Sequence, residues 1–288
     1  MFIVKYKAFF ITISALLVLL SCISFATFGL KQGIDFTGGT IIEASYGQQS
    51  PPVLDTVALK NAEIQAFPID GGYKFVSAFD YAQMTSKLAP IANVGGVSYV
   101  EKQVSTVGPT LGAEMKRKAV IAITIVVLAI LAFIAFSFRG VSDRVSSWKY
   151  GLIAMVTLIH DIVIAAGAYT LLSHFHGAEV DTLFVIALLT VMAVTISDKI
   201  VVFDRIRENL KVSKNKTFNE IVGISLSQTL VRSINTSMTT VIALTALYFF
   251  GPVATQFFSL TLMVGIVVGT YSSICVASTL LTLWNTKK

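Results

Sequence analysis

Two charged side chains stand next to each other inside an apolar stretch of the sequence. Asp198 and Lys199 occur in VTISDKIVVF, residues 194–203. Each costs roughly 2.5–3.5 kcal/mol at the centre of a bilayer, on scales derived from helix insertion. A carboxylate in such a place is functional by default, and the chemistry that Asp198 indicates is proton carriage. The structural alternative is a buried carboxylate held by the hydroxyl of Thr195, one turn away.

Lys199 is not expected to neutralise Asp198 directly, because adjacent residues of a helix point about 100° apart. The two side chains should therefore have partners on different helices. Lys199 is either a paired cation in the interior or a side chain that snorkels to the headgroups, about six residues or roughly 9 Å away. If bending or a shared water brings the two groups together, Lys199 tunes the charge of Asp198.

Three further ionisable residues belong with Asp198 as candidates. Arg232 is either a plain anchor at the start of a helix or a counter-ion of Asp198. His160 and Asp161 lie near the middle of another apolar stretch, where they either join a proton relay or form a hydrogen-bonded network. One histidine without a second ligand nearby is a poor metal site. No metal, organic cofactor or catalytic residue is predicted.

Membrane helices must position these residues. Of the 288 residues, 55% are hydrophobic and only 13% are charged, whereas soluble domains are about 25% charged. Because a helix needs about 20 mostly apolar residues to cross a bilayer, division at charges and at Gly251-Pro252 predicts six spans. Gly265 and Gly269 form a GxxxG pair, which predicts close helix packing within the chain or with a partner. The six spans are residues 8–30, 119–138, 150–172, 182–203, 233–250 and 257–283.

Basic residues predict the orientation of these helices. The short loops 173–181 and 251–256 hold no lysine or arginine, so they are expected on the outer side. Both termini are then cytoplasmic. The basic residues of the predicted cytoplasmic segments are Lys5, Lys7, Arg139, Arg144, Lys149, Arg205, Arg207, Lys211, Lys214, Lys216, Lys287 and Lys288.

Residues 31–118 are long enough to fold as a small domain outside the membrane. Their pattern predicts the order βαββαβ, which is that of a ferredoxin-like split βαβ unit, with Gly71-Gly72 as a hairpin turn. The expected elements are a strand 40–46, a helix 53–63, strands 64–69 and 73–79, a helix 81–89 and a strand 96–107. The prediction is a polytopic α-helical membrane protein with a small α+β extracytoplasmic domain, divided into 1–30, 31–118 and 119–288.

Six motifs then give a family resemblance. They are GIDFTGGT (33–40), VGPTLGAEMKRKAV (107–120), LIHD (158–161), VVFDRIREN (201–209), INTSMTT (234–240) and GIVVGTYSS (265–273). In this order they resemble the SecF family, whose members pair with SecD in bacterial protein export. The motif residues that this match singles out are Gly33, Asp35, Phe36, Gly38, Gly39, Asp204, Arg205, Arg207, Glu208 and Asn209.

The resemblance implies an accessory subunit of the Sec machinery. With SecD it would use the proton motive force to promote late translocation and release of unfolded preproteins on the outer side, without covalent catalysis. It implies SecYEG as a further partner, extends the set to YajC and YidC, and places the chain in the bacterial inner membrane. Asp198 and Arg232 match the family's proton-relay positions. No nucleic-acid partner is indicated.

Two points stay open at the level of sequence. The family's usual stretch reads approximately Gly-Tyr-Ser-Ile-Asn-Asp-Thr, whereas residues 193–199 of this chain read AVTISDK. Lys199 therefore stands where the family has threonine. The open question is whether proton coupling is tuned here as in the family, or whether the buried Lys199 itself gains and loses a proton. The alternative function is a proton-driven exporter of small molecules or lipids, of the same resistance–nodulation–division superfamily and working as a homo-oligomer.

Overall fold

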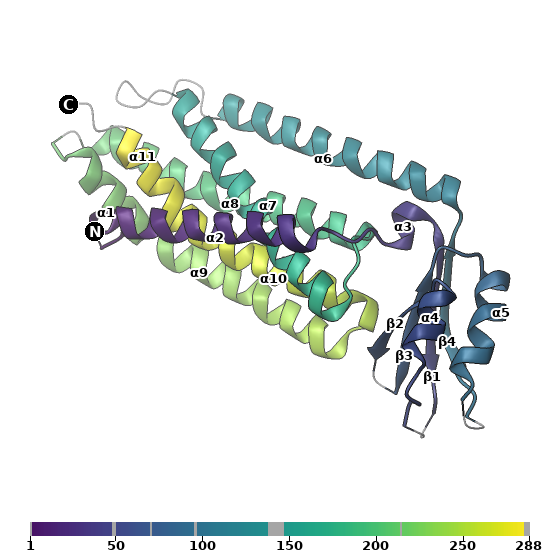
Figure 1. Cartoon of the computed structure of the whole chain (residues 1–288). Coiled ribbons are helices and arrows are strands. Elements are labelled where there is room, and N and C mark those ends of the chain that lie inside the picture. Colours follow the sequence, from purple (N-terminus) through teal and green to yellow (C-terminus); the bar gives the residue numbers. More distant parts are fainter. Residues whose placement is uncertain are drawn as a thin grey trace. The chain divides into compact units, whose positions relative to one another are not determined.

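The computed structural model describes residues 2–47, 50–69, 71–94, 97–137, 147–213 and 215–284. The chain divides into two compact units (Figure 1). The helical unit comprises residues 1–29, 123–174 and 183–288, and the sheet unit comprises residues 30–122 and 175–182. Several residues named in the predictions lie outside the described ones: Gly96, Phe138, Arg139, Arg144, Lys214, Lys287 and Lys288.

Six helices of the described chain are long and apolar enough to cross a membrane, which confirms the predicted fold class. They begin with α2 (Lys7–Phe28), after a four-residue α1 (Phe2–Lys5). The others are α6 (Pro109–Ser137), α7 (Ser147–His176), α8 (Thr182–Val212), α9 (Phe218–Phe250) and a last span made of α10 (Gln256–Tyr271), η2 (Ser272–Ala277) and α11 (Ser278–Trp284).

Three helices, α6, α8 and α9, extend well beyond the predicted spans because charged residues continue them. α8 runs nine residues past Phe203, and two ion pairs at i, i+3 spacing support this extension, Arg205 with Glu208 at 2.7 Å and Arg207 with Asp204 at 3.7 Å. α9 begins at Phe218, where Thr217 and Glu220 form a capping box. Charge marks the edge of the apolar span, but it does not end the helix.

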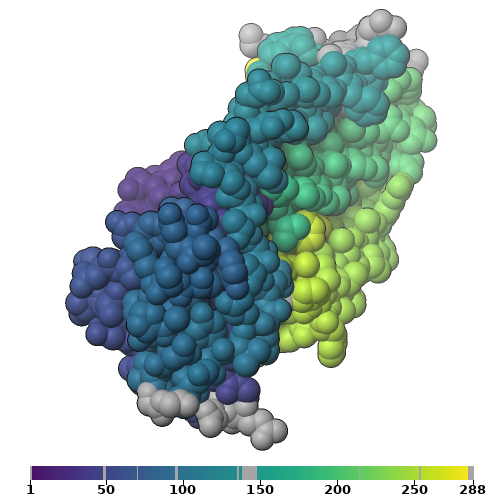
Figure 2. Space-filling model, turned by 90° about the vertical axis from the view of Figure 1, so that its right-hand side faces the viewer, coloured from purple at the N-terminus to yellow at the C-terminus, as the bar shows by residue number. Residues whose placement is uncertain are grey.

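Three of the six spans form the interior of the helical unit. About half of the most apolar window of α7, α8 and the last span is buried, at 56%, 50% and 61%. The corresponding shares are 17% for α2, 6% for α6 and 11% for α9. Figure 2 shows α6, in teal, at the surface. The apolar faces of α2, α6 and α9 are thus left for lipid or for other proteins.

The last span contains a π-helical segment, η2, between α10 and α11. A π turn is rare and often marks a functional position. All six residues of η2 are buried, and the hydroxyl of Ser273 donates a hydrogen bond to the carbonyl of Gly269 at 2.7 Å. The sequence predicted one uninterrupted helix over this region, because neither proline nor glycine marks the change.

The described residues of the sheet unit form four antiparallel strands in the order β2-β3-β1-β4. The strands are β1 (Gly39–Ser45), β2 (Gln65–Ile69), β3 (Gly72–Ser77) and β4 (Val100–Val107). Helix α4 (Thr56–Asn61) lies between β1 and β2, and α5 (Tyr81–Ala92) lies between β3 and β4, so the predicted order βαββαβ is present. The assignment to the ferredoxin-like class stays a prediction.

Local sequence explains helices α4 and α5 of the sheet unit. Asp55 and Asp80 are their N-caps: Asp55 accepts the backbone N–H groups of Val57 and Ala58, and Asp80 accepts that of Gln83. The prediction ended α5 before Pro90, but the helix continues to Ala92. Leu88 and Ala92 are fully buried in the core under the sheet. The free energy gained by burying these two side chains offsets the loss of the backbone hydrogen bond that Pro90 cannot donate.

Residues 175–182 pack with the sheet unit through backbone bonds. The N–H of Gly33 donates to the carbonyl of Val180 at 2.9 Å, and the N–H of Val180 donates to Lys31 at 2.8 Å. In the middle of this segment, burial raises the pKa of Glu179, although the charges of Lys31 and Lys74 act in the opposite direction. The folded sheet unit therefore favours the protonated form of this side chain.

Glu179→Gln is expected to stabilise this contact at neutral pH. The pKa of Glu179 is raised above its ordinary value of 4.5 on folding, so its favourable contribution is complete below pH 4.5 and is lost as the pH rises through the folded value. Glutamine removes that loss. Hydrogen exchange of the Gly33 amide should slow in the variant at pH 7 and remain nearly unchanged at pH 4, relative to the original chain. Equal effects at both pH values would contradict this.

Candidate functional site

Asp198 lies on α8 and is half-buried in the helical unit. Its Oδ1 accepts a hydrogen bond from the hydroxyl of Ser233, on α9, at 2.6 Å. Its Oδ2 is buried and accepts no hydrogen bond of normal geometry among the described residues, although the hydroxyl of Ser273, in η2, lies near enough to act on the carboxylate. One carboxylate oxygen is thus held by a neighbouring helix, while the other is enclosed and unsatisfied, an arrangement that is costly for a permanently ionised group.

The predicted bond between Thr195 and Asp198 is absent. The hydroxyl of Thr195 is buried and has no partner within the described part of the chain. The methyl side of Thr195 faces α10, because a β-carbon placed on Gly269 would lie 2.0 Å from its Cγ2. Thr195 thus packs against α10 and does not bond Asp198 within α8. Ser233, on α9, is the residue that bonds Asp198 instead.

Arg232 directly precedes Ser233 on α9, so it is at the depth of Asp198. Its side chain is exposed in the described chain and forms no ion pair with Asp198 within 4.0 Å. Arg232 and Lys199 both act electrostatically on Asp198. Because the Arg232 guanidinium is near the Asp198 carboxylate but not in contact with it, Asp198 can be either ionised or protonated beside the charged Arg232. Its roles as anchor and counter-ion remain predictions.

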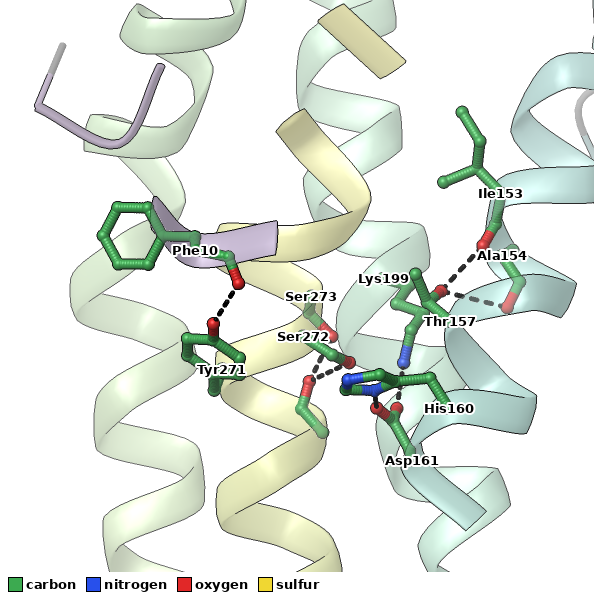
Figure 3. Close-up of polar contacts among 11 residues, drawn as sticks. Phe10, Ile153, Ala154, Thr157, His160, Asp161, Lys199, Tyr271, Ser272 and Ser273 are labelled. Atoms are coloured by element: carbon green, nitrogen blue, oxygen red, sulfur yellow. Dashed lines mark hydrogen bonds and ion pairs between the residues drawn. The ribbon is translucent and has the colours of Figure 1, made fainter. Parts of the chain in front are cut away.

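Lys199 is fully buried and paired, so the snorkelling alternative is wrong. Its Nζ lies 2.5 Å from Oδ2 of Asp161, on α7. Oδ1 of the same carboxylate lies 2.9 Å from Nδ1 of His160. Figure 3 shows these contacts, with Lys199 and His160 on different oxygens of Asp161. As expected from helix geometry, Asp198 and Lys199 have partners on different helices, α9 and α7.

Gly265 and Gly269 lie against α8, within the chain. A β-carbon on Gly265 would lie 2.3 Å from Cγ2 of Val191. On Gly269 it would meet Thr195 and would also lie 3.6 Å from Oδ2 of Asp161. The glycine pair therefore brings α10 close to the segment of α8 that carries Asp198 and Lys199.

The first motif is a turn that only glycine permits. Gly38 and Gly39 have φ values of +78° and +132°, and a β-carbon on Gly39 would lie 2.3 Å from the carbonyl oxygen of Ser77. Asp35 accepts the backbone N–H of Thr182, the first residue of α8, at 2.9 Å. Phe36 is buried in the sheet unit. This motif organises backbone and supplies no reactive group.

The VVFDRIREN motif forms the extension of α8. Besides the two ion pairs described above, Asn209 donates to the hydroxyl of Ser225 and to the side-chain carbonyl of Gln228, both on α9 and both at 2.8 Å. The polar end of α8 is thus attached to α9. Within the described ranges, no group of three or more His, Cys, Asp or Glu side chains is arranged to hold a metal ion.

Comparisons with known proteins agree with the motifs. Residues 87–287 match the family model described as "Protein export membrane protein SecD/SecF, C-terminal", and residues 23–50 match the "SecD/SecF GG Motif". The chain is 39% identical to protein translocase subunit SecF of Thermobaculum terrenum, over 99% of this chain and 94% of the relative. It is 35% identical to SecF of Desulfurispirillum indicum, over 97% of this chain and 90% of the relative.

A solved structure gives the same result for the fold. The crystal structure of SecDF, a translocon-associated membrane protein from Thermus thermophilus, matches 99% of this chain with a TM-score of 0.82 and 30% identity. This chain spans 38% of that SecDF chain. With the family models, the relatives and the six spans taken together, this chain belongs to the SecF family of protein translocase subunits, multi-pass membrane proteins of Sec-dependent export.

Proposed function

We propose that this chain works with SecD to use the proton motive force for late translocation and release of preproteins on the outer side of the membrane. The names of the relatives support the role in export, and the SecDF match supports SecD as a fused or paired partner. The other proposed partners are SecYEG and an unfolded preprotein, together with YajC and YidC, which the family resemblance implies. The bacterial inner membrane with both termini cytoplasmic is the proposed location.

The observation that carries the proton part of this proposal is the environment of Asp198. Its Oδ1 is bonded to Ser233, and its Oδ2 is buried and accepts no hydrogen bond of normal geometry among the described side chains, because the nearby hydroxyl of Ser273 donates to the carbonyl of Gly269. A proton on Oδ2 makes the group neutral and removes the cost of an unsatisfied charge. Release of that proton requires a cation to approach. Arg232, one residue from Ser233, is the proposed cation because its side chain forms none of the ion pairs described above.

Proton transfer is then coupled to movement of α9. When the Arg232 guanidinium approaches, the ionised form of Asp198 is favoured; when it withdraws, the protonated form is favoured. Protonation of Asp198 changes the relative free energies of the two positions of α9, and the position of α9 in turn changes the free energy of protonating Asp198. The proposed relay consists of Asp198 and Arg232, with protons as the coupling ion, and no covalent step on the preprotein is involved. The relatives' names as translocase subunits favour this function over the exporter of small molecules or lipids.

The test measures proton-gradient-dependent release of an exported protein from membrane vesicles that contain the matching SecD. Asp198→Asn is expected to reduce release to the level measured without a gradient, since the amide cannot carry a proton. Glu114→Gln is the matched control: it makes the same chemical change at an exposed carboxylate of α6, and full gradient dependence is expected. Co-purification with SecD establishes assembly. Full gradient dependence in assembled Asp198→Asn vesicles would falsify the proposed relay.

A further inference from the structure

The carboxylate of Asp161 has two groups on it that can be cationic. Lys199 occupies Oδ2 and His160 occupies Oδ1, at 2.5 and 2.9 Å. The side chains of Asp161 and Lys199 are fully buried, and that of His160 is 9% exposed. These three residues, here called the Asp161 cluster, share no hydrogen bond with Asp198 among the contacts of the described residues.

A single negative charge sets how many positive charges this cluster holds. The Lys199 ammonium already neutralises the Asp161 carboxylate, and neither side chain has exposed area. A second cation on His160 would be a like charge beside Lys199 in a low-dielectric region, which disfavours it. A neutral imidazole has one donor nitrogen and one acceptor nitrogen. Since an ionised carboxylate only accepts hydrogen bonds, the proton must be on Nδ1.

The second nitrogen of His160 is then a lone-pair acceptor. Nε2 is buried, and the described residues provide it with no hydrogen-bond partner. In Figure 3 the ring of His160 lies between Asp161 and the η2 segment. A buried acceptor of this kind is a place to which a proton could be added without loss of an existing bond.

The surroundings supply no other cation for Asp161 in the described chain. From α8, the charged neighbours are Lys199 itself and Asp198, whose bonded oxygen faces Ser233 on α9. The η2 segment presents the hydroxyls of Ser272 and Ser273, both of which donate to Gly269. Tyr271, just before it, donates to the carbonyl of Phe10 on α2. Cys275 is buried in η2.

We propose that Lys199 is a positioning residue that fixes the charge state of the His160–Asp161 pair. Its ammonium takes the place of a proton on His160, so the imidazole stays neutral with Nδ1–H on Asp161. Without Lys199, the cluster recovers its missing positive charge by protonation of His160 at Nε2. This concerns the charge of the cluster alone and holds whether or not Asp198 carries protons.

The test is nitrogen NMR of ¹⁵N-histidine in the full chain in lipid nanodiscs. His174 and His176 are exposed, so the background His174→Gln/His176→Gln leaves His160 as the single labelled ring. At pH 7 the unmodified cluster should show a neutral imidazole with its proton on Nδ1. Lys199→Met, which keeps the length without the charge, should raise the ratio of charged to neutral His160 at least about tenfold. Lys199→Met/Asp161→Asn should return it to the neutral form.

The expected charge of His160 is neutral with Lys199 present, positive in Lys199→Met and neutral again in Lys199→Met/Asp161→Asn. A purely structural role of Lys199 would not produce this order. The proposal is overturned if His160 is an imidazolium, or carries its proton on Nε2, in the chain that retains Lys199. This measurement uses the unchanged Asp161 cluster. A neutral His160 in the Lys199→Met variant overturns the proposal equally. Because the first measurement needs no substitution at 160, 161 or 199, a variant that fails to fold does not leave the proposal undecided.

Discussion

Asp161→Asn is expected to destabilise the helical unit by about 3–5 kcal/mol, the usual cost of removing one partner of a buried ion pair. The variant leaves the Lys199 ammonium, which is fully buried, opposite an amide that cannot neutralise it. The Nδ1–H of His160 also loses its charged acceptor. Among the substitutions considered for this chain, this one has the largest expected effect on stability.

Unfolding of the purified chain in mixed micelles, followed by circular dichroism, measures this effect. The double variant Lys199→Met/Asp161→Asn removes both charges and should recover most of the loss, because a neutral pair of similar volume replaces an ion pair at little net cost. Asp204→Asn is the matched control on α8: its side chain is 65% exposed, and a change within about 0.5 kcal/mol is expected. A single variant as stable as the original chain would show that the pair contributes nothing.

Gly269→Ala is the second substitution with a large expected effect, about 1–3 kcal/mol of destabilisation from overpacking. The added methyl group would lie 2.0 Å from Cγ2 and 2.8 Å from Cβ of Thr195. Thr195 is buried and β-branched on a rigid helix, so it cannot turn away as a long side chain would. Either α10 or α8 must move, and the segment that carries Asp198 and Lys199 moves with it.

The same unfolding measurement tests this packing with an internal rescue. Thr195→Ser removes the Cγ2 atom, so Gly269→Ala/Thr195→Ser should be more stable than Gly269→Ala alone. Gly151→Ala provides the control, since its nearest neighbour, Cγ2 of Ile134, would be 3.6 Å away. That control should be neutral or slightly stabilising, because alanine favours helix over glycine. Additivity between positions 195 and 269 would count against direct contact.

Sequence reasoning found the spans because apolar length is a strong physical requirement in a bilayer. It placed their ends less well. Arg205 and Glu208 marked a boundary by their charge, yet they form an ion pair along the same continuing helix. It also missed α1 and the η2 segment, since a π turn leaves no composition signal. In the sheet unit, the order of strands and helices followed from turn residues and alternation.

At the site, sequence reasoning identified the charged residues but not all of their partners. Helix geometry required Asp198 and Lys199 to separate, and they do. The choice of Thr195 as the partner of Asp198 rested on proximity along one helix. Ser233 is 35 positions away in the chain, and only the packing of α9 against α8 brings it close. The same holds for Asp161 and Lys199, whose contact depends on how α7 lies against α8.

The η2 segment sets the rotational phase of the end of the chain. An α-helix turns about 100° with each residue, and a π turn takes one residue more than an α turn. The buried hydroxyls of α11, at Ser278, Thr279 and Thr282, are therefore about one residue step out of phase with the glycine face of α10. Deleting one residue from Ser272–Ala277 would therefore let a regular α-helix form with those hydroxyls still facing the interior, whereas conversion of the segment to α-helix without a deletion would rotate them by about 100°.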